Sequence, residues 1–421
     1  METMESGHPN TELALAPEDM QWWRDAKFGM FLHWGVYAIP GRGEWVMFVE
    51  RMDVDEYRKL ADRFDPKEFD ARAWAKAAKD AGMRYMVLTA RHHDGFCLFD
   101  SNASEFTSAK TAAKRDFVAE YCEACRDAGL GVGLYYSPMD WRFPGYFFPD
   151  MYRKSAETMK EQCWTQVREL MSNYGRIDIL WYDGAWLAHG GIGFDPGRRG
   201  WYQETGADAS ATWFWEPEKL NSMVRELQPK VVINPRSGWR GDFDTREGFT
   251  GEMQTDRPWE QCDTLTGTWG HIPGHPMRSL RSCVQLLAMV AVRDGNLLLN
   301  VGPTPEGTFE PRQVHRLAEV GEWLEKYGES IYDTRGGPFK PGPWGGSTYR
   351  GSTAYLHILD WPEDTLTLPA LLERKIVASR SLTGKTVSVH QTDEVVEVEV
   401  PPPDREAMDT IIVLELEKPT A

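Results

Sequence analysis

The chain has 421 residues, of which 41% are hydrophobic, so it is long enough for a large domain with an appendage and can bury a full core. Its formal net charge of −17 argues against a nucleic-acid partner, which needs clustered Lys and Arg. No apolar run is long enough to span a membrane and no signal-peptide pattern is seen near the first residue, so we expect a cytoplasmic protein with no membrane partner.

Residues 1–20 are polar and predict a loose lead-in. Beyond them, apolar runs rich in β-branched and aromatic residues alternate with stretches of helical periodicity. Strands are predicted at 28–33, 85–90, 132–137, 177–183, 230–234 and 296–302. One helix ends near residue 173, and the others are predicted at 53–64, 66–81, 116–128, 216–228, 276–293 and 311–328. The pattern over 237–275 predicts no element.

Strands that alternate with helices predict a parallel sheet. The polar residues that could do chemistry follow the strands, which favours a (β/α) TIM-like barrel over an open doubly wound sheet. No Gly-x-Gly-x-x-Gly turn follows the first strand, so a dinucleotide cofactor is not expected. From about residue 335, short alternating runs without helices predict a β-sandwich. We therefore expect a lead-in at 1–20, the barrel at 21–334 and a C-terminal β-sandwich at 335–421.

The six cysteines are too sparse for a disulfide framework and fit reduced thiols. Cys122 and Cys125 form a C-x-x-C within a helical pattern, and no second pair of Cys or His follows at zinc spacing. Ordinary helix residues are therefore the favoured interpretation, with a redox or zinc site as the alternative.

The segment IDILWYDGAW at 177–186 has the strongest functional pattern. It begins as a buried strand and must turn at Asp183-Gly184, which places the Asp183 carboxylate at the C-terminal end of the strand between Trp181 and Trp186. Catalytic groups of (β/α) barrels lie at these strand ends, and an acid walled by aromatic rings suits an enzyme that cleaves sugars. An Asp that only caps the following helix is the alternative interpretation.

Other predicted strands also end in polar residues: His33, the pair His92 and His93, Tyr136, and Arg236. Glu44, with Trp45 beside it, lies in the loop after the first strand. Successive residues of a strand point to opposite faces, so the two adjacent His cannot both ligate one ion, and no HExxH or facial-triad spacing occurs. We expect no metal and interpret the imidazoles as partners of sugar hydroxyls.

Hydrolysis of a sugar bond requires a second carboxylate. Sequence reasoning alone does not choose among the acids at 242–263, which are Asp242, Asp244, Glu247, Glu252, Asp256, Glu260 and Asp263. A general acid needs a pKa raised toward neutrality by a poorly solvated site, and the neighbouring Trp259 makes Glu260 attractive on that ground.

Seven motifs together resemble the alpha-L-fucosidase family, glycoside hydrolase family 29. They occur in the family's order over roughly residues 20–330, and they are HWGVY (33–37), GEW (43–45), LTARHHDGF (88–96), GLYYS (133–137), LWYDGAW (180–186), GTWG (267–270) and LLLNVGPTPEGTF (297–309). The resemblance implies a catalytic barrel with a C-terminal β-sandwich, no cofactor, and exo-acting hydrolysis of terminal alpha-L-fucosyl residues with retention. It implies Asp183 as the nucleophile, and as substrate-binding residues His33, Glu44, His92, His93, Tyr136, Arg236 and Trp269. We also expect Trp45, beside Glu44, and Trp181, beside Asp183, to bind the substrate.

The acid/base is the weakest part of this resemblance. Glu247 closes a segment that matches the family except that Arg246 stands where Pro is usual, and Glu260 is the other family-like acid. The segment before Arg236 reads NPR where NDR is usual. Two further functions stay open, a non-catalytic fucose- or glycan-binding relative and a retaining glycosidase for a related sugar such as a galactoside. We expect loops 138–152 and 185–215 to choose the linkage and aglycone, and a homo-oligomer is compatible with the sequence.

Overall fold

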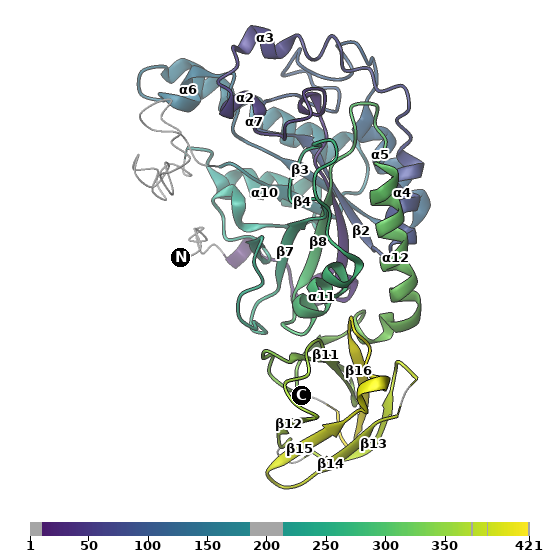
Figure 1. Cartoon of the computed structure of the whole chain (residues 1–421). Helices are drawn as coiled ribbons and strands as arrows, with labels where there is room; N and C mark the ends of the chain where they lie inside the picture. The colour runs from purple at the N-terminus through teal and green to yellow at the C-terminus, as the bar shows by residue number, and fades with distance from the viewer. Residues whose placement is uncertain (1–10, 186–213, 372–373, 385, 420–421) are drawn as a thin grey trace.

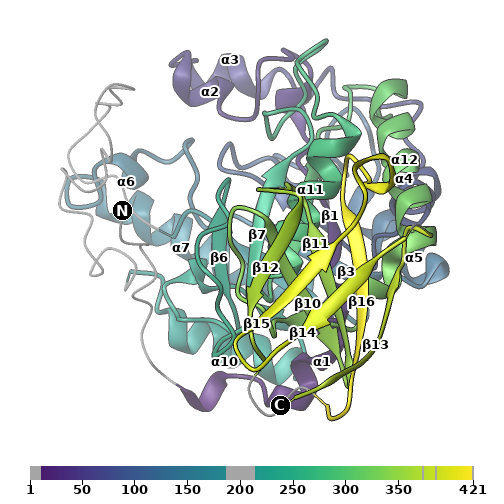
Figure 2. The same ribbon diagram turned by 60° about the horizontal axis from the view of Figure 1, so that its bottom comes forward.

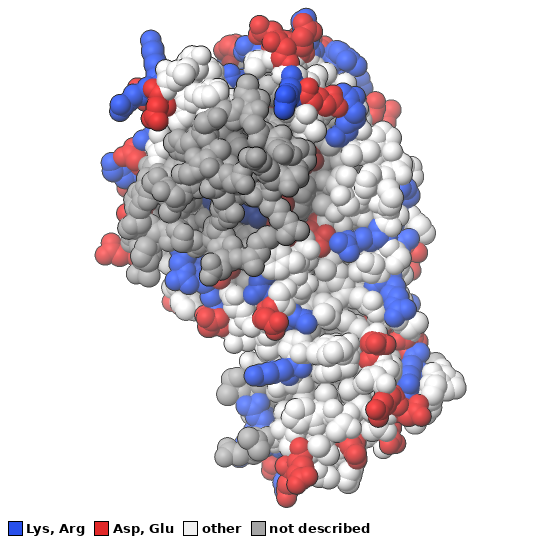
Figure 3. Space-filling model, turned by 60° about the vertical axis from the view of Figure 1, so that its left-hand side comes forward, with Lys and Arg blue, Asp and Glu red and all other residues white. Residues whose placement is uncertain are grey.

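The computed structural model describes residues 11–185, 214–371, 374–384 and 386–419. Figure 1 shows a larger part built of helices and strands, with a smaller all-β part beside it. Within the described residues, no helix is long and apolar enough to cross a bilayer. On the face drawn in Figure 3, basic and acidic side chains alternate over the described surface instead of gathering by sign.

The larger part is organised around one eight-stranded parallel sheet. Its hydrogen-bonded order is β5-β4-β3-β2-β1-β8-β7-β6. The strands are β1 (Phe28–Leu32), β2 (Tyr85–Arg91), β3 (Gly131–Tyr136), β4 (Ile179–Tyr182), β5 (Val232–Ile233), β6 (Asp244–Glu247), β7 (Trp259–Thr264) and β8 (Asn296–Val301). β5 and β6 are not paired directly, and Asp242 connects them. Its N–H donates to the Ile233 carbonyl (2.7 Å), and its Oδ2 accepts from Ile233 N (2.8 Å). The predicted TIM-like barrel is confirmed.

Helices surround this sheet. Figure 1 shows α4, α5 and α12 packed together along one side, while α7 and α10 contact each other on another. The helices are α1 (Pro17–Ala26), α2 (Val46–Val49), α3 (Val54–Arg58), α4 (Ala71–Asp80), α5 (Phe117–Ala128), α6 (Pro144–Phe147), α7 (Arg153–Asn173), α10 (Pro217–Leu227), α11 (Leu280–Ala291) and α12 (Pro311–Tyr327).

Helix α5 shows how the sequence sets such an element. The Asp116 side chain caps its first turn by accepting from Ala119 N (2.9 Å), and Gly129 ends it in the left-handed conformation. Cys122 and Cys125 lie on its buried face as free thiols. Burial raises the pKa of the Cys122 thiol to about 12, so the C-x-x-C supplies core packing rather than a reactive thiolate.

Side chains alternate between the barrel interior and the helix layer along each strand. On β3, Tyr135 points inward and packs with the interior cluster, whereas Tyr136 packs with the outer one. Other interior side chains are Phe31, Tyr85, Val87, Ile179, Trp181, Val232, Cys262 and Leu298. Because the strands are parallel, this alternation decides which side chains reach the site at their C-terminal ends.

The C-terminal part is a β-sandwich, as predicted (Figure 2). One sheet has the order β13-β16-β11-β10-β9 and the other β12-β15-β14. Its core includes Phe339, Leu356, Leu366 and Val398. The strands are β9 (Arg335–Gly336), β10 (Gly345–Arg350), β11 (Thr353–Ile358), β12 (Thr365–Pro369), β13 (Ile376–Ser381), β14 (Ser388–Gln391), β15 (Val395–Glu399) and β16 (Thr410–Leu416). The domain limits proposed from the sequence stay a prediction.

Two kinds of element differ from the sequence prediction. The helix expected at 53–64 is α3 alone, after which the chain continues to Arg63 in i→i+3 turns. The helix expected at 66–81 begins only at Ala71, because Asp70 caps it by accepting from Arg72 N. Strands β6 and β7 lie within 237–275, where no element was predicted. Both strands are rich in polar residues and therefore lack the apolar run by which the other strands were predicted.

Candidate active site

Asp183 follows the last residue of β4, and its N–H donates to the Tyr136 carbonyl (3.2 Å) in continuation of the strand ladder. The chain turns immediately at Gly184, which has a φ of +76°. A Cβ at Gly184 would lie 2.7 Å from Met139 Cε and 3.1 Å from the His93 ring, so only glycine fits the turn. The carboxylate therefore lies at the C-terminal mouth of the barrel, where its side chain is 15% exposed.

Both oxygens of Asp183 are bound by side chains from neighbouring segments: Tyr135 on β3, and Arg236 in the turn after β5. Oδ1 accepts from Arg236 (3.1 Å) and Oδ2 from the Tyr135 hydroxyl (3.1 Å), while His93 Nε2 lies 3.6 Å from Oδ2. Arg236 also donates to Glu247 Oε2 (2.7 Å), so one guanidinium bridges two carboxylates. Burial opposes the charge on Arg236, but Glu247 and Asp183 raise its pKa well above the usual value. The Pro before Arg236 begins the 3₁₀ turn Pro235–Ser237, which leaves the guanidinium in the site.

Glu247 is the last residue of β6 and has a 43% exposed side chain. The preceding residue, Arg246, lies on the opposite face of the strand. Its guanidinium covers the Trp259 ring at 3.8 Å and donates to the Glu252 carbonyl (2.8 Å). Arg246, which stands where Pro is usual in the family, therefore does not displace Glu247 from Arg236.

Glu260 lies in a different layer. It is the second residue of β7 and is 1% exposed inside the barrel. Its Oε2 accepts from the Tyr85 hydroxyl (2.6 Å) and its Oε1 from the Trp181 indole N–H (3.1 Å). Burial raises the pKa of Glu260 to about 7, against the effect of these two hydrogen bonds. The structure brings Glu247, and not Glu260, to the guanidinium that holds Asp183.

Three neutral imidazoles line the mouth. Burial lowers the pKa of His33 to about 4 and that of His93 to about 3, and it lowers that of His92 as well. His33 Nδ1 lies 2.7 Å from Asn300 Oδ1. The Asn300 amide nitrogen donates to the Trp269 carbonyl (2.8 Å), so its oxygen is the acceptor and His33 Nδ1 carries the proton. His33 Nε2 is thereby left as a hydrogen-bond acceptor for a hydroxyl.

His92 and His93 do not lie on a strand, as the sequence argument had assumed. β2 ends at Arg91, so both residues lie in the turn beyond the strand and their ring centroids are only 4.0 Å apart. His93 is held by Ser137, whose Oγ lies 2.6 Å from Nδ1. In the described part of the chain, no three His, Cys, Asp or Glu side chains are grouped so as to hold a metal ion.

Two predicted substrate-binding residues need correction. The Tyr136 hydroxyl points into the helix layer and donates to Gln166 (2.9 Å), while its neighbour Tyr135 reaches Asp183. Trp181 is 1% exposed, so it supports the site from below and offers no open face to a sugar. The period-2 alternation could have found Tyr135, because Tyr135 pairs with Trp181 and shares an inward face with Asp183.

The remaining predicted residues form the walls. Glu44 is buried and its Oε2 accepts from Gly270 N (2.8 Å), with burial raising the pKa of its carboxyl. Trp269 and Trp45 are half-buried, with ring centroids 5.1 Å from His33 and 5.3 Å from His93 respectively. Trp141, which sequence reasoning missed, lies 5.0 Å from Trp45 and comes from loop 138–152. Trp186 and most of loop 185–215 lie outside the described residues.

Two carboxylates joined by one guanidinium, surrounded by neutral imidazoles and aromatic rings at the mouth of a (β/α) barrel, define the class as a glycoside hydrolase. The model of the family "Alpha-L-fucosidase" matches residues 3–329. The chain belongs to the alpha-L-fucosidase family.

Individual relatives agree with this. The chain is 30% identical over 382 residues to tissue alpha-L-fucosidase of Bos taurus, covering 81% of this chain and 75% of the relative. Among solved structures, alpha-L-fucosidase isoenzyme 1 of Paenibacillus thiaminolyticus has a TM-score of 0.80 at 34% identity, covering 95% and 99% of the two chains. A family 29 alpha-L-fucosidase of Bacteroides thetaiotaomicron, solved as a trapped covalent intermediate with 2-fluoro-fucosyl fluoride, has a TM-score of 0.83 at 27% identity, covering 96% and 97%.

Proposed function

We propose that the protein is an exo-acting, retaining alpha-L-fucosidase in which Asp183 is the nucleophile and Glu247 the acid/base. The observation that carries this proposal is the bridge from Arg236 to both carboxylates. A retaining enzyme needs its two carboxyl groups about 5–5.5 Å apart, and side chains that share one guanidinium are held close enough to act on the same glycosidic bond.

In the first step, Asp183 attacks the anomeric carbon while Glu247 protonates the departing oxygen. In the second step, Glu247 takes a proton from water, which displaces the sugar from Asp183 with a second inversion. The roles fit the exposures, because the nucleophile is the more enclosed carboxylate and the acid/base must meet both aglycone and water.

The side chains that line the barrel mouth suit a small sugar with one apolar face. Neutral His33 can accept a hydrogen bond from a hydroxyl through Nε2, and neutral His92 and His93 can bind hydroxyls as donors or acceptors according to their tautomers. The half-buried rings of Trp269 and Trp45 suit the apolar face and the methyl group of fucose. An alpha-L-galactoside carries a hydroxymethyl group where fucose carries that methyl, and a buried hydroxyl without a partner is costly.

The test is hydrolysis of a panel of aryl glycosides. We expect turnover of the alpha-L-fucoside, slower turnover of the galactoside, and release of the alpha anomer of fucose first, seen by proton NMR. Release of the beta anomer would contradict retention. Binding of fucose without turnover by the wild-type chain would favour the non-catalytic alternative, and faster turnover of the galactoside would replace the substrate.

A further inference from the structure

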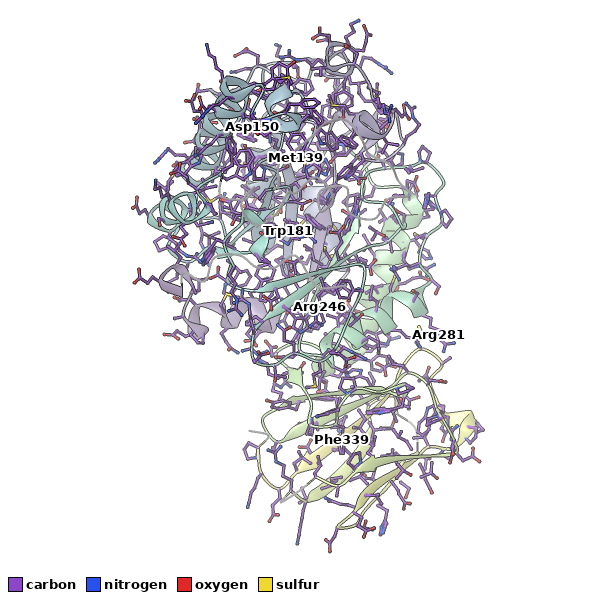
Figure 4. The ribbon with its side chains drawn as sticks, turned by 90° about the vertical axis from the view of Figure 1, so that its left-hand side faces the viewer. Met139, Asp150, Trp181, Arg246, Arg281 and Phe339 are labelled. Carbon is purple, nitrogen blue, oxygen red and sulfur yellow. The ribbon has the colours of Figure 1, made fainter. Side chains whose placement is uncertain are left out.

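The two groups that bind the Asp183 oxygens rest on the same indole ring. Tyr135 stacks on Trp181 with ring centroids 5.7 Å apart and an interplanar angle of 16°. The Arg236 guanidinium carbon lies 5.1 Å from the centroid of the Trp181 ring. A rotation of this indole would therefore displace the donors to Oδ1 and Oδ2 together. Figure 4 shows Trp181 at the centre of the barrel part, below Met139 and above Arg246.

The indole has one polar anchor, the hydrogen bond from its N–H to Glu260 Oε1 (3.1 Å). The other oxygen of Glu260 accepts from Tyr85 at the start of β2, so the carboxyl ties Trp181 to the opposite end of the barrel interior. Rings alone can slide against one another, since stacking is weakly directional, but a hydrogen bond to a fixed acceptor defines the angle of the indole plane.

If Glu260 served only to fill space in the core, its burial would be energetically unfavourable. It is 1% exposed, and among the described residues its two oxygens bind uncharged partners, the Tyr85 hydroxyl and the Trp181 indole, with no ion pair to Lys, Arg or His. An apolar side chain of the same size would fill the space without the desolvation cost of a carboxyl. A buried acid without a cation, aimed at the ring that carries both nucleophile-binding groups, indicates a role in the site above it.

We propose that Glu260 is a positioning residue of the reaction: through the Trp181 indole it fixes Tyr135 and Arg236, and through them the carboxylate of Asp183. The proposal rests on the proposed function. It gives Glu260 no contact with the substrate and no proton transfer, which separates it from the acid/base role that the sequence left open for this residue.

The two roles predict different kinetics. In the first step, the general acid is dispensable when the leaving group needs no proton, whereas a misplaced nucleophile is slow with every leaving group. The rate of covalent labelling by 2-fluoro-fucosyl fluoride, followed by intact mass, reports nucleophilic attack on its own, because fluoride leaves with little acid assistance.

The experiment compares three full-length variants with wild type. Glu260→Met keeps the volume and loses the acceptor, Glu260→Gln keeps an acceptor for the indole, and Glu247→Gln removes the proposed acid/base. We expect Glu260→Met to label about 10- to 100-fold more slowly, with the same factor for aryl fucosides of good and poor leaving groups. Glu260→Gln should label within about 3-fold of wild type, and Glu247→Gln should label readily while losing activity on poor leaving groups.

Thermal unfolding and near-UV circular dichroism establish that each variant is folded. If Glu260→Met does not fold, Trp181→Phe supplies the same test, since it keeps a ring and loses the N–H. Labelling at the wild-type rate by Glu260→Met, or by Trp181→Phe where that variant replaces it, would overturn the proposal. A loss of activity confined to poor leaving groups and rescued by azide would overturn it too. Absence of fucoside turnover by wild type would instead refute the proposed function on which it rests.

Discussion

The hydroxyl of Tyr135 donates a 3.1 Å hydrogen bond to Oδ2 of Asp183. The adjacent tyrosine, Tyr136, has the same chemistry but points through the other face of β3 to Gln166. One strand thus provides both a site residue and its matched control. The difference between them is set only by the direction of the side chain.

Replacing Tyr135 by Phe should lower kcat/KM for an aryl alpha-L-fucoside by about 10- to 100-fold, because an oriented hydrogen bond to the nucleophile is lost. Replacing Tyr136 by Phe should leave kcat/KM near wild type and reduce the free energy of unfolding by about 1 kcal/mol, since Gln166 loses a buried partner. Equal activity losses in the two variants would show that the alternation of β3 does not define the site.

The charge between the two carboxylates should be indispensable. Replacing Arg236 by Met leaves Asp183 and Glu247 without their shared cation. We expect a fall in kcat/KM of about 100- to 1000-fold, the size seen when one preorganised electrostatic partner is removed. Arg246→Met is the control, because that guanidinium covers Trp259 outside the barrel mouth. Comparable losses in both variants would contradict the roles assigned to these neighbouring arginines.

The sequence predicts the position of Asp183 because a short apolar strand followed by Asp-Gly allows few alternatives. It also predicts the strands that became β1 to β5 and β8, whose residues are mostly apolar. It misses β6 and β7, since the barrel interior and mouth tolerate polar side chains there: Glu247 pairs with Arg236, and Glu260 with Tyr85 and Trp181.

The choice between neighbours on one strand is harder to predict. Motif matching placed the tyrosine at position 136, whereas the alternation, once anchored on Asp183, selects Tyr135. The burial of Trp181 could not be read from the sequence, because it depends on how the Tyr135 and Phe31 rings fill the barrel above and beside it.

The raised pKa of Glu260 should also make the free energy of unfolding depend on pH. Its pKa is raised from 4.5 to about 7 in the folded chain, so the folded state binds more protons than the unfolded state between these values. The neutral carboxyl is favoured on folding, and its contribution is present below pH 4.5 and is lost as the pH rises to 7, by roughly 3 kcal/mol.

Glu260→Gln lacks this titration. Its free energy of unfolding relative to wild type should therefore increase between pH 4.5 and 7, as measured by urea unfolding at several pH values. Glu247→Gln, which alters an exposed carboxyl, is the control. A difference between Glu260→Gln and wild type that does not change with pH would show that Glu260 keeps its ordinary titration in the fold.

The central claim is that Asp183 is the residue that forms the bond to the sugar. The most direct measurement is to label the full-length protein with 2-fluoro-fucosyl fluoride, digest it with a protease and locate the adduct by tandem mass spectrometry. We predict one fucosyl adduct per chain, on the Asp183 carboxylate, and none in Asp183→Asn. An adduct on Glu247 or Glu260, or equal labelling of Asp183→Asn, would contradict it.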